Sequence, residues 1–126
     1  MNDRQIFGEF IKTNRNKHEL TVRLMAEMIG VGAGYYSDIE SGRRTPIDFG
    51  FLDRIAEVLH LSDEDREIFY DLAGRARSAA PPDLTDYINE SKEARIALRV
   101  AKEKASDDDW RRFVQELEQK KERENG

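Results

Sequence analysis

Apolar residues recur at helical spacing along almost the whole chain, and no stretch alternates apolar with polar residues as a half-buried strand does. The first stripe, in a predicted helix from Asp3 to Lys17, consists of Ile6, Phe7, Phe10 and Ile11. Because such faces are buried only when helices pack against one another, the predicted fold class is all-α.

Residues that favour helix ends divide the first 76 residues into five predicted helices. Thr21 is a favoured cap for the second helix, and Gly30 ends it because glycine accepts a left-handed backbone. Gly42 stops the third helix, and Ser62 begins the fifth. The second to fifth helices are predicted at 22–29, 33–41, 48–60 and 62–73.

The adjacent Pro81 and Pro82 mark the expected domain boundary, because paired prolines stop a helix and stiffen the chain. We therefore predict a domain over residues 1–76, a linker over 77–83 and a helical extension over 84–126. The extension carries three apolar stripes: Leu84, Tyr87 and Ile88; Ala94, Ala97, Leu98 and Ala101; and Trp110, Phe113, Val114 and Leu117. They are too thin to form a core of their own, so they must pack on the first domain, on a second copy, or on both. A homodimer contact is the preferred interpretation.

The composition argues against several kinds of chemistry. Without cysteine, the chain forms no disulfide, thiolate metal site or cysteine nucleophile. His18 and His60 stand apart from any metalloprotease or serine-nucleophile motif. The acidic runs 63–65 and 107–109 each follow a serine at a predicted helix start, where carboxylates favour the helix dipole, so we interpret them as caps rather than metal ligands. We predict no enzyme activity, no cofactor and no metal site.

The first residues mix charged with apolar side chains and never reach the apolar run of a signal peptide or membrane span. With the lack of cysteine, this predicts a cytoplasmic protein without a membrane partner. The net charge of −5 has the wrong sign for bulk attraction to nucleic acid. Phosphate binding nevertheless depends on a few local cations, and Arg43 and Arg44 lie together after the third helix.

Residues 20–46 carry the most informative pattern. A small residue at Ala26 lets the second predicted helix cross closely over the third, and Gly30 makes the turn between them. Val31 and Ile39 fill the angle between the two helices. These are the sterics of a helix-turn-helix, whose recognition helix enters a major groove about 12 Å wide.

The same stretch resembles the phage-repressor and Cro-like (XRE) family of helix-turn-helix regulators. The matching residues are Thr21, Met25-Ala26, Gly30-Val31, Ser37, Ile39-Glu40 and Gly42, and the likeness extends over roughly residues 4–75. The resemblance implies a five-helix lambda-repressor-like domain and a transcriptional regulator of double-stranded DNA. It further implies a repressor that binds a palindromic operator as a homodimer, since family members usually bind paired half-sites.

The resemblance also implies roles for individual residues. In the family, an arginine of the first helix commonly pairs with a glutamate near the end of the recognition helix. Here these are Arg15 and Glu40, which we expect to form a partly buried, structural ion pair. The implied phosphate-binding positions are Thr21, Val22, Ser41, Arg43 and Arg44. The implied base-facing positions are Ala33, Gly34, Tyr35, Ser37 and Asp38.

This chain departs from the family pattern at several of those positions. Ala33 and Gly34 stand where polar base readers are frequent, and Val22 replaces a frequent glutamine. Three explanations stay open: readout through backbone positioning and DNA shape, specificity from loops and dimer spacing, or lost affinity. The alternative function is therefore a protein-interaction or antitoxin-like module with little affinity for DNA.

Overall fold

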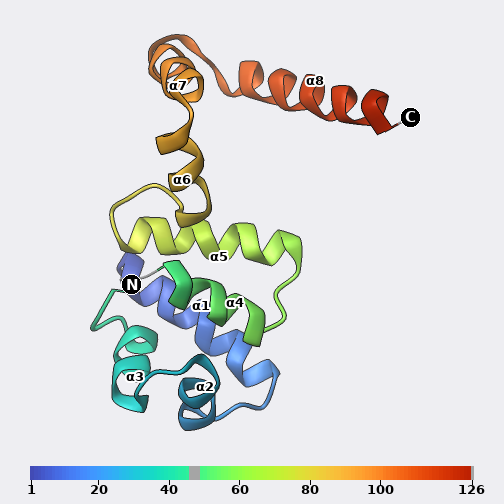
Figure 1. Ribbon diagram of the computed structural model, residues 1–126. Coiled ribbons are helices and arrows are strands. Elements are labelled where there is room, and N and C mark those ends of the chain that lie inside the picture. The colour runs from blue at the N-terminus through green and yellow to red at the C-terminus, as the bar shows by residue number, and fades with distance from the viewer. Residues whose placement is uncertain (46–48, 126) are drawn as a thin grey trace. The chain divides into compact units, whose positions relative to one another are not determined.

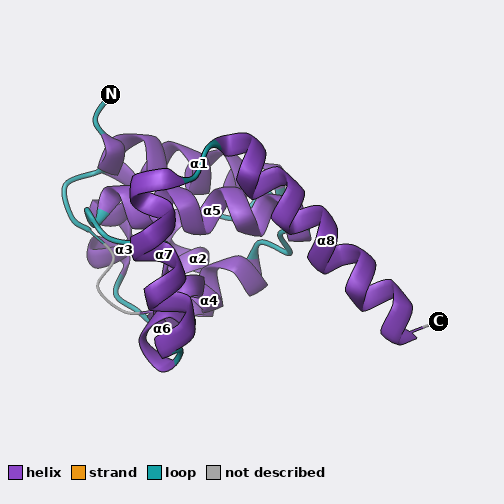
Figure 2. Ribbon diagram, turned by 90° about the horizontal axis from the view of Figure 1, so that it is seen from above, coloured by secondary structure: helices purple, strands orange, loops and turns teal. Residues whose placement is uncertain are grey.

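The computed structural model describes residues 1–45 and 49–125, and within these ranges all regular structure is helical (Figure 1 and Figure 2). The prediction of an all-α fold is confirmed. The helices are α1 (Asp3–Lys17), α2 (Val22–Ile29), α3 (Ala33–Ser41), α4 (Phe49–Val58), α5 (Asp63–Ala76), α6 (Pro82–Glu90), α7 (Lys92–Lys104) and α8 (Asp107–Asn125). None of the helices in the described ranges is both long and apolar enough to cross a membrane. Internal contacts divide the chain into two compact units, Met1–Asp86 and Tyr87–Gly126.

The first unit is organised around α1, which packs against both α3 and α5, while α2 packs against α3 and α4. Phe7 of α1 meets Phe69 of α5, with 5.4 Å between the ring centroids. Tyr36 of α3 and Leu52 of α4 are fully buried in the same core. Each such side chain contributes about 1.5–3 kcal/mol by leaving water, so a few large residues hold these helices together.

Local signals set the helix ends of this unit. Thr21 Oγ1 accepts a hydrogen bond from the Leu24 amide at 3.0 Å and starts α2, while Ser62 Oγ accepts one from the Asp65 amide at 3.1 Å and starts α5. Gly30 ends α2 with a φ of 87°, a left-handed conformation that favours glycine. The predicted bounds of α1, α2 and α3 are confirmed.

The sequence analysis did not identify the cap of α1, and it placed the ends of α4 and α5 differently, since α5 continues to Ala76 beyond the predicted end at 73. Asn2 caps α1 through a capping box, in which Asn2 and Gln5 each accept a hydrogen bond from the amide of the other at 2.9 Å. α4 ends at Val58, and the predicted end at His60 is wrong because His60 takes a φ of 48° and reverses the chain. Asp48, the predicted first residue of that helix, lies outside the described residues.

The chain folds back onto α5 within the segment 77–83, for which the sequence predicts a linker. The Ala79 amide donates a hydrogen bond to the Gly74 carbonyl oxygen at 2.9 Å. Pro82, the first residue of α6, is buried. These contacts bring the double proline into the first unit, which continues to Asp86.

The second unit has defined helix ends but no interior. Ser91 Oγ accepts a hydrogen bond from the Ala94 amide at 3.1 Å, and Ser106 Oγ accepts one from the Asp109 amide at 3.2 Å. The Asp109 carboxylate accepts a hydrogen bond from the Ser106 amide in return, which lowers the pKa of Asp109. Among the side chains described from residue 87 onward, none is buried. The unit therefore has caps to define its helices and no core to hold them together.

α1 and α3 lie close together at Gly8, which is buried on α1. A Cβ atom at this position would lie 2.1 Å from the carbonyl oxygen of Glu40. That contact is with backbone, so it cannot be relieved by a side-chain rotation. Only glycine therefore allows the two helices to pack at this distance.

Gly8→Ala is expected to lower the free energy of unfolding by at least about 2 kcal/mol, because the two helix backbones must move apart. Gly34→Ala is the matched control, since a Cβ atom there has no neighbour within 4 Å. That change should raise the free energy of unfolding by about 0.5–1 kcal/mol through helix propensity. Urea denaturation followed by circular dichroism measures both, and equal stability of the two variants would contradict the close approach.

Candidate nucleic-acid interface

The turn between α2 and α3 is a sharp reversal at Gly30. The amides of Gly30 and Val31 both donate hydrogen bonds to the Ala26 carbonyl oxygen, at 2.9 and 3.0 Å. The next helix begins at Ala33 and buries Tyr36, while its first two residues stay exposed. The geometry thus gives α3 one buried side and an open leading edge, which is the arrangement of a recognition helix.

An ion pair ties α3 to α1. Arg15 Nη2 and Nε donate hydrogen bonds to the two carboxylate oxygens of Glu40, at 2.6 and 3.0 Å. Arg15 Nη1 donates a third hydrogen bond to the Leu20 carbonyl oxygen at 2.7 Å. The two charged side chains are only 10% and 8% exposed, and the hydrogen bond to Glu40 raises the pKa of Arg15. Arg15 is therefore a structural residue that also supports the loop between α1 and α2.

The Tyr36 hydroxyl is buried near this ion pair and has no hydrogen-bond partner among the described residues. Burial raises the pKa of Tyr36, and the Glu40 carboxylate raises it further. The side chain is therefore a neutral phenol, and its ring packs in the core.

The open edge of α3 is poor in polar side chains. Ala33 and Gly34 are exposed and carry no hydrogen-bonding side-chain group, whereas Ser37 is partly exposed and Ser41 is exposed. A Cβ atom at Gly34 would meet nothing within 4 Å, so the first unit leaves space beside the helix at this position. Small side chains let a base edge approach the helix backbone closely, but they offer few side-chain hydrogen bonds.

Tyr35 is half-buried and acts as a support. Its ring packs edge-on against Phe51 of α4, with 5.6 Å between the centroids. The Arg44 guanidinium carbon lies 5.3 Å from the centroid of the Tyr35 ring. Such a cation–π contact contributes about 0.5–1 kcal/mol at an exposed site, so Tyr35 helps to position Arg44.

Asp38 gathers both arginines that follow the recognition helix. Its carboxylate lies 3.1 Å from Arg43 Nε and 3.9 Å from Arg44 Nε. The Asp38 carbonyl oxygen also accepts hydrogen bonds from the amides of both arginines, at 2.9 and 3.1 Å. The arginine side chains are 69% and 52% exposed, so these ion pairs are weak and open to exchange with a phosphate. Sequence reasoning placed Asp38 among the base-facing residues and missed this contact.

The start of α2 offers a second set of groups to a phosphate. Thr21 is exposed, and its oxygen accepts the capping hydrogen bond from the Leu24 amide, which leaves the hydroxyl proton to donate elsewhere. Val22 is half-buried and packs on the core, so only its backbone is suited to this role. Arg23 is exposed in the same first turn and was not selected from the sequence, although a cation beside a helix start is a recognisable signal for a phosphate contact.

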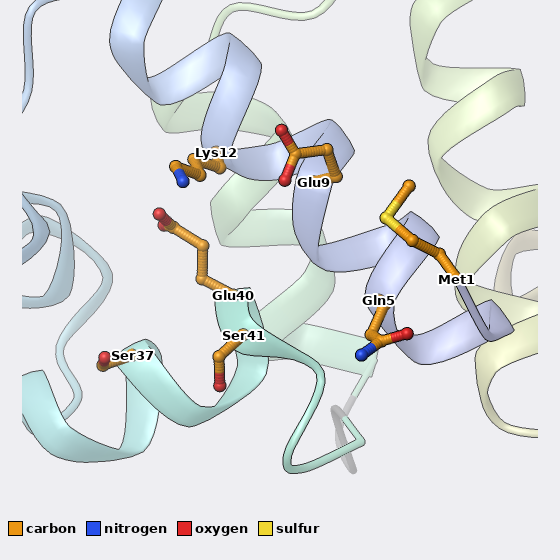
Figure 3. A pocket seen from close by; sticks show the side chains of 7 residues that line it. All are labelled: Met1, Gln5, Glu9, Lys12, Ser37, Glu40 and Ser41. Carbon is orange, nitrogen blue, oxygen red and sulfur yellow. The ribbon is translucent and has the colours of Figure 1, made fainter.

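A polar hollow of about 320 Å³ lies beside the recognition helix (Figure 3). It is lined by Met1, Gln5, Glu9 and Lys12 from the N-terminal segment and by Ser37, Glu40 and Ser41 from α3. Acidic and basic side chains share this lining, and nowhere in the described ranges do three or more potential metal ligands gather. The hollow brings Lys12 of α1 to the side of α3 that carries Ser37 and Ser41.

Comparison with known proteins identifies the family to which this region belongs. Residues 6–69 match the family described as Helix-turn-helix domain. Among solved structures, the chain is similar to one described as the crystal structure of the clp gene regulator ClgR from Corynebacterium glutamicum, with 29% sequence identity. That similarity covers 73% of this chain and 96% of that chain, with a TM-score of 0.49. No curated protein matches the sequence. The family match extends from α1 into α5 and so includes α2 and α3.

Glu40→Ala is expected to lower the free energy of unfolding by about 3 kcal/mol, because it leaves the mostly buried Arg15 guanidinium without its counter-charge. The double replacement Arg15→Met with Glu40→Leu should lose much less, since it removes both charges and keeps apolar volume. Thermal and urea denaturation of the three proteins measure the difference. A double variant as unstable as Glu40→Ala would show that shape, rather than charge balance, governs this contact.

Proposed function

The chain belongs to the helix-turn-helix domain family of DNA-binding transcriptional regulators, and we propose that it is a sequence-specific repressor that binds a palindromic operator as a homodimer. The observation that carries the proposal is the open edge of α3 with two exposed arginines directly after it. A helix needs both an unobstructed edge and adjacent cations to enter a groove lined by phosphates. In this proposal the protein binds DNA and catalyses no reaction. Its site of action is the cytoplasm, where the DNA lies.

The contacts divide into two classes. Phosphate contacts come from Arg43, Arg44 and Ser41 after α3, and from the start of α2 around Thr21 and Val22, where the helix dipole favours an anion. Base contacts come from the first turns of α3, through Ala33, Gly34, Ser37 and the accessible part of Tyr35. Because Ala33 and Gly34 have no polar side chains, readout at these positions relies on thymine methyl contacts and DNA shape.

The proposal of a homodimer is supported by what the second unit lacks. Two-fold related half-sites are about 34 Å apart when they lie on one face of the duplex, so a repressor of this kind needs an element that joins two copies. The described side chains from residue 87 onward include no buried residue, although several large apolar ones are present. These exposed apolar side chains would form the contact between two copies. Two copies that occupy an operator together would block access of the transcription machinery.

A protein-interaction module is the competing candidate, and two observations favour it. The chain carries a net charge of −5, and both Arg43 and Arg44 are paired with Asp38. A surface with more acidic than basic side chains attracts a basic protein partner, while its exposed arginines can still bind a nucleic acid. The salt dependence of DNA binding separates the two functions.

Replacement of Arg43 and Arg44 together by alanine is expected to weaken binding to a duplex from the protein's own promoter. The slope of log affinity against log salt should fall by about 0.9 for each phosphate that the variant no longer neutralises. Fluorescence anisotropy at several salt concentrations measures the slope. Lys102→Ala with Lys104→Ala is the control, because it removes two exposed positive charges from α7 and should leave the slope unchanged. If the wild-type protein binds no duplex even at low salt, the interaction module becomes the better proposal.

Asp38→Asn should raise affinity for duplexes of any sequence by about fivefold at low salt, the factor that corresponds to a charge interaction of about 1 kcal/mol. The reason is that the change releases both arginines and removes a negative charge from a surface that meets phosphates. Asp71→Asn on α5 changes an exposed carboxylate by the same chemistry and serves as the reference. A loss of affinity confined to the operator would instead assign Asp38 to direct contact with a base.

A further inference from the structure

We propose that α8 is the dimer contact and that it pairs with α8 of a second copy in an antiparallel arrangement, with the two-fold axis passing between Phe113 and Val114. This inference rests on the proposed homodimer and adds the helix, the direction and the register. Its basis is the apolar stripe of α8, the symmetry of that stripe, and the charges at its two ends.

The stripe consists of the four large apolar residues of α8. Trp110, Phe113, Val114 and Leu117 are 38%, 48%, 49% and 48% exposed, respectively. Their spacing of three, four and seven residues places them on one face, as in a helix that packs against another helix. α7 also has exposed large apolar residues, Ile96, Leu98 and Val100, but their spacing of two residues does not place them on one face of a helix. Ala97 and Ala101 of α7 line a hollow of about 250 Å³ together with Ala105, Trp110 and Phe113.

The stripe is symmetric about its own midpoint. Trp110 is as far before that midpoint as Leu117 is after it, and Phe113 and Val114 flank it directly. A two-fold interface requires that if one residue contacts a second, the second contacts the first on the other side of the axis. Antiparallel pairing meets this condition, with Trp110 against Leu117 of the second copy and Phe113 against Val114.

The charges at the ends of the stripe select the antiparallel direction. Asp107 lies one turn before Trp110, and Lys120 lies one turn after Leu117; both are exposed. Antiparallel pairing sets each Asp107 beside Lys120 of the second copy, whereas parallel pairing sets Asp107 against Asp107 and Lys120 against Lys120. Within α8, Asp108 and Asp109 already form ion pairs with Arg111 and Arg112, but Asp107 forms none with the described residues. Its carboxylate is therefore available to the second copy.

Single cysteine replacements test the direction without ambiguity, because the chain has no cysteine of its own. Val114→Cys lies beside the proposed axis and should form a disulfide-linked dimer on mild oxidation. Asp107→Cys and Lys120→Cys should each remain unlinked, since in the antiparallel pair like positions are about 20 Å apart, far beyond the roughly 7 Å that a disulfide can span. An equal mixture of Asp107→Cys and Lys120→Cys should form linked heterodimers. Gels run with and without reductant give the readout.

Charge reversal provides a second measurement that does not depend on oxidation. Asp107→Lys and Lys120→Asp should each raise the dimer Kd about tenfold, and the double variant should restore it. Analytical ultracentrifugation measures the Kd, and circular dichroism checks that each variant keeps its helices. Recovery in the double variant is expected only if the two positions face each other across the interface.

The outcomes separate this inference from the proposed function. A dimeric protein in which Asp107→Cys and Lys120→Cys each link to themselves would overturn the antiparallel direction and leave the homodimer standing. A dimeric protein with no link at any of the three positions would overturn the choice of α8. A wild-type protein that stays monomeric at all concentrations would overturn both the homodimer and this inference, while binding to a duplex is measured independently.

Discussion

The position of the recognition helix depends on one mostly buried charge pair. Arg15 and Glu40 hold α3 against α1 at the point where Gly8 lets the two backbones meet, so charge and shape constrain the same contact. The pair is costly to break from one side only, which makes the helix orientation insensitive to small changes elsewhere. A helix that reads DNA has to be held at a fixed angle, and this buried contact between α1 and α3 fixes that angle.

The surface that would meet DNA carries few positive charges, and a carboxylate partly neutralises them. Asp38 draws Arg43 and Arg44 toward the end of α3, and Tyr35 supports Arg44 from beneath. In an acidic protein, such an arrangement limits attraction to phosphate until a duplex is close enough to displace the carboxylate. Binding then depends on the fit of a particular site rather than on bulk charge, which agrees with a helix edge made of small residues.

Local chemistry explains what could be predicted from the sequence. Thr21, Gly30 and Gly42 act on their immediate neighbours, and the helices next to them were predicted with the observed bounds. The contacts that were missed join residues through rotamers or distant elements: Asp38 with its arginines, Tyr35 with Phe51, and the return of the chain onto α5 after Ala76. No periodicity encodes those contacts, because each depends on where the backbone has already been placed. The end of α4 was misjudged because a left-handed backbone is uncommon at residues other than glycine, so the sequence did not indicate that His60 would adopt one.

A pair of capped helices without an interior has a consequence for how the protein behaves in the cell. If two copies associate through α8 as proposed, the order of this helix would rise and fall with the amount of protein present, because association would remove its apolar side chains from water. At low abundance this helix would fray and be accessible to proteases. A monomer would contact an operator through one recognition helix only and would dissociate quickly. Abundance would thus act on occupancy more steeply than in proportion, so a modest change in synthesis or degradation could switch a promoter.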